Sequence, residues 1–200
     1  IAESDNYDAA KDFKTSRETG RIGHELPLDE VGSSAYKSRN HDLGFAFKGG
    51  DHLLEAKIGL QDLPYQLYPN QRMDMLDNEQ LRLNLRYTGA FDWGALEMRA
   101  YREKVDHFMD FGADKRFVYT KMGQPPSAEC TEAQQAAGIC AAGMPMYSES
   151  RNTGFALKAD VNLSETDLLR LGAELQHYTL DDWWPPSGLG MSPETFWNVR

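Results

Sequence analysis

Apolar residues recur at every second position in six separate segments of this 200-residue chain. In residues 80–87, for example, four apolar side chains alternate with Gln80, Arg82, Asn84 and Arg86. Because successive side chains of a β-strand point to opposite faces, this alternation predicts strands with one apolar and one polar face. The six segments are residues 43–48, 54–60, 80–87, 96–101, 155–163 and 169–176.

Short and long gaps alternate between these segments. Gly49, Gly50 and Asp51 follow the first segment and form a hairpin signal. Loops of about 17 and 45 residues are difficult to accommodate in a compact soluble domain. Tight turns at one end and long loops at the other are typical of outer-membrane barrels. We therefore predict an all-β fold, an antiparallel transmembrane β-barrel fragment with an up-and-down meander, short periplasmic turns and long extracellular loops. Short turns are expected near residues 89–94 and 164–167, and long loops over 61–77, over 105–151 and from about Leu180.

Composition is compatible with this prediction. No run of 18 apolar residues exists, so no transmembrane helix is expected. The formal net charge of −10 argues against nucleic acid as a partner. A soluble antiparallel sheet with one face on a core is the alternative. Six or seven strands cannot close a large barrel, and open sheet edges are not viable in lipid. We therefore expect residues 1–200 to be part of the barrel domain of a longer protein.

Catalytic motifs are lacking: GxSxG, HExxH, CxxC and glycine-rich phosphate loops do not occur, and we expect no enzyme. Asp181 and Asp182 are interpreted as a solvated turn. Cys130 and Cys140 lie ten residues apart in one polar loop. This spacing favours a disulfide in an oxidising compartment, with two free thiols as the alternative.

Seven of the eight methionines lie outside the cores of the expected strands, in an unusual distribution for a residue that normally fills cores. In an extended segment, residues two apart point to the same side. Thioether and imidazole groups suit Cu(I), so these pairs are candidate metal ligands. The alternative is that the methionines pack the loops together. The pairs are Met73 with Met75, His107 with Met109, and Met144 with Met146.

Trp183 and Trp184 precede two prolines in the last expected loop. They form either a rigid aromatic platform that contacts a ligand or an anchor at the membrane–water boundary.

Several of these segments resemble TonB-dependent outer-membrane receptors, and among those the copper receptors. The resemblance spans roughly residues 40–200. It is carried by residues 64–75, Val105–Asp110, Gly143–Met146, Leu180–Pro186, Met191–Pro193 and Phe196–Asn198.

The resemblance implies a barrel of about 22 strands in the Gram-negative outer membrane, closed by a plug from a more N-terminal region. An inner-membrane TonB complex would energise uptake through that plug. In the copper group, a His-x-Met pair of the barrel joins a Cys and a Met of the plug. His107 and Met109 match the first pair. The Cys-x-x-x-Met of the plug is not found in this chain. Cys140 and Met144 have that spacing, but they lie in an expected loop of the barrel and not in a plug.

Three functions are expected in this order. The first is active copper import, with the copper ion as transported ligand, no catalytic cofactor, Met144 and Met146 as an outer relay, and outer-membrane lipid and the TonB complex as partners. The second is uptake of an iron siderophore or another metal chelate, held by Trp183, Trp184, Tyr147 and arginines. The third is a passive porin or an adhesin.

Overall fold

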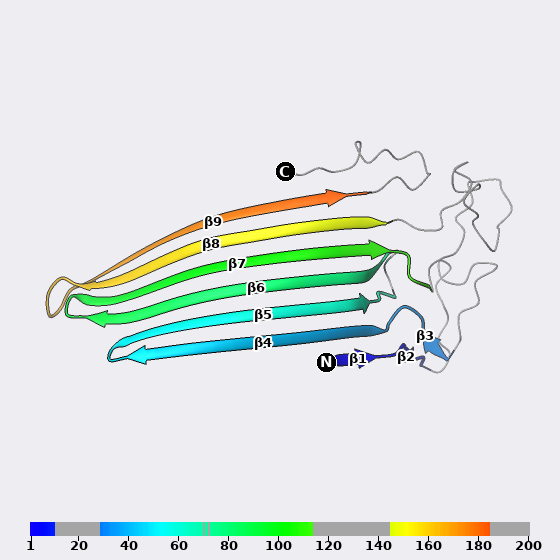
Figure 1. Ribbon diagram of the computed structural model, residues 1–200, viewed down its shortest axis with the longest axis horizontal. Helices are drawn as coiled ribbons and strands as arrows, with labels where there is room; N and C mark the ends of the chain where they lie inside the picture. The colour runs from blue at the N-terminus through cyan, green and yellow to red at the C-terminus, as the bar shows by residue number, and fades with distance from the viewer. Residues whose placement is uncertain (11–28, 70, 72, 114–144, 185–200) are drawn as a thin grey trace.

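A computed structural model describes residues 1–10, 29–69, 71, 73–113 and 145–184 of the protein. The described residues contain six long strands, which lie side by side in a single curved layer (Figure 1). Three very short strands lie near the N-terminus: β1 (Ala2–Ser4), β2 (Tyr7–Asp8) and β3 (Glu30–Val31). The long strands are β4 (Tyr36–Gly49), β5 (His52–Gln66), β6 (Asp74–Phe91), β7 (Gly94–Asp110), β8 (Met146–Asn162) and β9 (Leu168–Trp183).

The long strands form an up-and-down antiparallel meander. The order in the sheet is β1-β4-β5-β6-β7-β8-β9, so each long strand pairs with the next one in the chain. Tight turns join β4 to β5, β6 to β7 and β8 to β9 at one end, and the long connections from β5 to β6 and from β7 to β8 leave the sheet at the other end (Figure 1). The predicted fold class is confirmed: the chain forms part of an antiparallel β-barrel wall, and its sheet is not closed. Among the described residues, none belongs to a helix able to cross a bilayer.

The tight turns follow from local chemistry. Gly50 lies at the first central position of the β4–β5 turn with φ of 57°, a left-handed conformation that glycine adopts without a steric penalty. In the β8–β9 turn, the Ser164 hydroxyl accepts from the Asp167 amide at 3.1 Å and donates to its carboxylate at 2.5 Å. These turns set the register that brings equivalent side chains to one face of the sheet.

One face of the sheet is aliphatic, as the alternation predicts. Leu43, Ile58 and Leu83 lie opposite one another on β4, β5 and β6. Phe45, Ala56, Leu85, Ala100, Phe155 and Leu175 form the next row across all six strands. Exposed fractions on this face reach 75% at Leu175, because no second layer covers it in the described structure. We call it the aliphatic face; an apolar surface of this extent fits a membrane or protein contact.

The opposite face, which we call the polar face, carries charged and amide side chains in cross-strand contact. Arg86 binds Glu97 at 2.8 Å and Glu55 at 3.4 Å. Arg99 donates to Asn84 at 2.9 Å. The side chains of this face therefore satisfy one another across neighbouring strands.

The strands extend further than predicted. The loop expected over 61–77 contains the end of β5 and the start of β6, and the loop expected over 105–151 contains the end of β7 and the start of β8. β9 likewise continues past Leu180, so the solvated turn expected at Asp181 and Asp182 is wrong. Beyond the aliphatic rows, apolar residues no longer alternate regularly with polar ones, and backbone pairing continues without that signal.

Because the predicted strands were too short, three methionines were also assigned to loops. Met75, Met109 and Met146 were expected in loops and lie instead in β6, β7 and β8. They belong to the parts of these strands nearest the long connections, and this placement determines the geometry of the candidate site.

Candidate metal site

Three methionines occupy one row across the sheet. Met109 of β7 lies directly opposite Met75 of β6 on one side and Met146 of β8 on the other. Side chains of directly opposed residues share a face, with Cβ atoms about 5 Å apart. A register shift between Met75 and Asp77 accompanies this alignment. Met75 is 6% exposed, so the row is partly shielded from water. Three thioether side chains thus lie side by side on one face, at the loop end of the sheet.

His107 lies two residues before Met109 on the same strand, and therefore on the same face. Its Nδ1 is 3.0 Å from Asn78 Oδ1. In the tautomer with the proton on Nδ1, that nitrogen donates to Asn78 and leaves the Nε2 lone pair available to a metal. The arrangement resembles the outer hydrogen bond that orients many metal-binding histidines.

The surroundings of His107 favour the neutral form of its imidazole. Burial lowers the pKa of His107 below its ordinary value of 6.5, and the nearby carboxylate of Asp182 partly opposes this shift. His107 lies seven residues beyond Ala100, the last aliphatic-face residue of β7, so it is outside the aliphatic rows. A neutral imidazole is the form that binds metal ions.

Met73 is buried just before β6, with 8% exposure. Met144, Cys130 and Cys140 lie outside the described residues, so the second half of the Met144–Met146 pair and the disulfide stay predictions.

Trp183 lies on the face of the sheet opposite His107 and Met109. It ends β9 opposite Tyr147, and the two rings stack at 5.4 Å with an interplanar angle of 12°. Tyr147 in turn contacts Phe108 at 4.6 Å, and Phe108 points away from the face that carries His107 and Met109. These three rings therefore form a ladder on the face opposite the methionine row. Trp184 follows the strand and is half-buried.

Two residues near His107 were missed by the sequence analysis. Asn78 is 29 positions away and Asp182 is 75 positions away, and both approach His107 only through strand register. No local sequence signal could identify them. A cluster of three or more His, Cys, Asp or Glu side chains suited to a metal does not occur within the described ranges.

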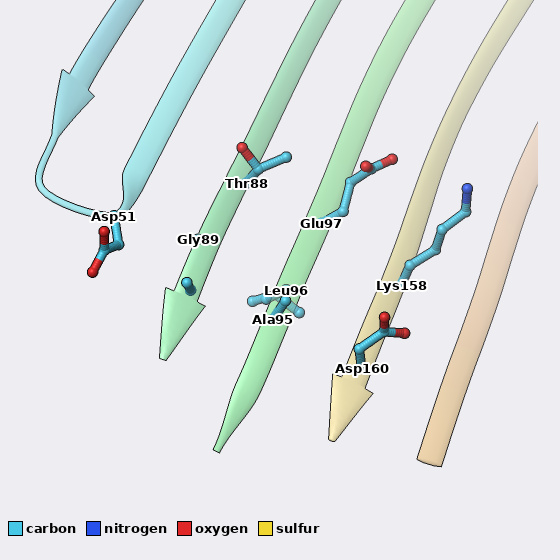
Figure 2. A pocket seen from close by; sticks show the side chains of 9 residues that line it. Asp51, Thr88, Gly89, Ala95, Leu96, Glu97, Lys158 and Asp160 are labelled. Carbon is cyan, nitrogen blue, oxygen red and sulfur yellow. The ribbon is translucent and has the colours of Figure 1, made fainter. Parts of the chain in front are cut away.

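A separate polar pocket of about 420 Å³ lies near the tight turns. Figure 2 shows Thr88, Glu97 and Lys158 side by side on β6, β7 and β8. Glu97 already binds Arg86 at 2.8 Å. The pocket is far along the strands from the methionine row, and it holds neither thioether nor imidazole among its lining residues.

Of the comparisons with known proteins, the one with solved structures gives a match. No protein-family model and no curated protein sequence matches the chain. The structure is similar to the solved structure of "Copper transporter OprC", with a TM-score of 0.58 and 20% sequence identity. The similarity covers 76% of this chain and 21% of that one, so the chain spans about a fifth of the length of this neighbour. At this identity the similarity shows the fold alone: this chain is built like a segment of that transporter.

Proposed function

We propose that this chain is part of an outer-membrane, TonB-dependent receptor that actively imports copper. The observation that carries the proposal is the row Met75–Met109–Met146 with His107 beside it on the same face. Soft thioethers select Cu(I) over harder cations, and a neutral imidazole is compatible with the same ion. The structural similarity to a copper transporter supports the proposal at the level of the fold.

The two faces of the sheet support placement in a membrane. The aliphatic face would meet hydrocarbon, and the polar face would line the interior of the complete barrel. The methionine row then lies near the long connections, where a ligand arriving from outside would be met first. Copper is the cargo in this proposal, and no catalysis is involved. The TonB complex would supply energy through a plug domain that lies outside this sequence.

The chelate alternative receives less support. It relied on Trp183, Trp184 and Tyr147 as an aromatic ligand platform. The stacked rings of Trp183 and Tyr147 stand on the face opposite His107, where the membrane boundary would lie.

The test is Cu(I) affinity of the complete protein in detergent, together with copper uptake by cells. Met109→Leu keeps the size and apolar character of the side chain but removes the sulfur, and we expect about a tenfold or greater loss of affinity. Met98→Leu is the matched control, because Met98 lies on the same strand but on the aliphatic face. Equal affinity in the two variants would remove the copper assignment. Passage of sugars into liposomes would instead favour the passive porin.

A further inference from the structure

The aliphatic face ends at a band of charged side chains. One row beyond Leu43 and Ile58, Lys104 and Arg151 lie directly opposite each other, and one row further Asp106 lies opposite Glu149. Lys104 binds Asp106 at 2.8 Å, and Arg151 binds Glu149. On β4 and β5, Arg39 binds Asp62 at 2.9 Å. These cations of the band therefore each have a carboxylate partner.

Arg102 is different. It lies opposite Leu83 on β6 and Thr153 on β8, in the same row as Leu43 and Ile58, and its side chain is exposed. It forms no ion pair or hydrogen bond with any residue in the described part of the chain. An unpaired guanidinium at the edge of an apolar surface is costly unless it reaches water or an anion. At a membrane surface, an anionic headgroup would supply the partner that the described residues do not.

An apolar groove leads to Arg102. The groove has a volume of about 420 Å³ and crosses four strands, from β5 to β8. The groove passes over the small side chains of Ala56 and Ala100, and larger side chains flank them. Its aliphatic-face lining consists of Ala56, Ile58, Leu83, Leu85, Ala100 and Thr153, with Arg102 at the edge.

We propose that this groove binds a phosphorylated lipid, with an acyl chain in the groove and the phosphate on Arg102. The groove matches the chain in polarity, and the guanidinium matches the phosphate in charge and in its forked donor geometry. Lys104 lies two residues further along the same face, about 7 Å away, opposite Arg151. The inference rests on the proposed membrane location.

The test is lipid binding to the complete protein in non-ionic detergent, followed by native mass spectrometry. The probe is phosphatidic acid, with diacylglycerol and inorganic phosphate as separate arms. We expect one tightly bound phosphatidic acid, and weak binding of both other probes. Arg102→Gln should reduce the affinity about tenfold, because it removes a charge-assisted contact. Ala100→Phe should block the chain by filling the groove.

Arg39→Gln is the matched control, since Arg39 lies on the same face but is paired with Asp62 away from the groove. Binding to Arg102→Gln and Ala100→Phe at the level of Arg39→Gln would overturn the inference. Equal binding of diacylglycerol would also overturn it, because the phosphate would then be irrelevant. Copper affinity is measured on the same samples. Lost lipid selectivity with intact copper binding refutes only this inference. Intact lipid selectivity without copper binding refutes only the proposed cargo.

Discussion

At the scale of single residues, Asn78 is the side chain that orients His107. Its Oδ1 lies 3.0 Å from His107 Nδ1. Removing an orienting partner of a metal-binding histidine typically costs 10–100-fold in affinity, so we expect Asn78→Ala to weaken Cu(I) binding about tenfold. Competition titration with a Cu(I) chelator measures this effect. The control is Asn84→Ala, on the same strand and face, which contacts Arg99 and should leave copper affinity unchanged.

The pKa of His107 gives a second residue-scale prediction. Burial lowers this pKa below 6.5, so the imidazole stays unprotonated in the folded protein at pH values where a free imidazole is charged. Cu(I) affinity should therefore hold down to pH 6.5 and decline only below it, as protons compete for Nε2. Affinity measured from pH 8 to pH 5 checks this. His107→Leu should remove the decline, whereas His177→Leu, on the aliphatic face, should retain it. A decline that begins well above pH 6.5 would contradict the assignment.

At the scale of elements, the start of β6 is held by a buried carboxylate. Asp74 is fully buried, and its Oδ1 accepts from the Tyr68 amide at 2.7 Å. Losing this hydrogen bond to a carboxylate should destabilise the start of the strand by about 1–3 kcal/mol. Asp74→Ala should therefore speed hydrogen exchange at the Tyr68 amide and shift Met75 within the methionine row. Asp77→Ala, an exposed position of the same strand, is the control. Unchanged exchange at Tyr68 in Asp74→Ala would show that the contact is dispensable.

The strands themselves could be predicted from sequence where one face is aliphatic. Leu81, Leu83 and Leu85 give a clear period of two, and the turn at Gly50 gives a clear stop. The strand ends could not be predicted, because beyond Lys104 charged and apolar residues are mixed on both faces and the regular alternation disappears while backbone pairing continues.

Only the part of the candidate site that lies on a single strand could be predicted from the sequence. His107 and Met109 share a strand, so their spacing alone places them on one face. The alignment of Met75 and Met146 with Met109 depends on register across three strands and on the bulge between Met75 and Asp77. A slip of one residue would move either side chain to the opposite face.

At the scale of the whole molecule, the two faces should respond differently to charge. In a membrane barrel, an arginine on the lipid side near the bilayer centre costs about 2–4 kcal/mol. Leu157→Arg, on the aliphatic face, should therefore lower stability in lipid vesicles by about that amount. Ala156→Arg, one residue away on the polar face, should be tolerated. Urea unfolding of the complete protein in vesicles compares the two. Equal stability would argue that the aliphatic face contacts something other than hydrocarbon.

The contacts of the polar face bear on how metals would be told apart. Arg86 neutralises both Glu55 and Glu97, and Lys57 lies 3.3 Å from Asp42. The carboxylates along this stretch already have cationic neighbours supplied by the wall itself. In the proposed importer, an ion moving past them would meet carboxylates that the wall itself already neutralises. Selection among metal ions would then depend on the sulfur atoms of Met75, Met109 and Met146 near the long connections.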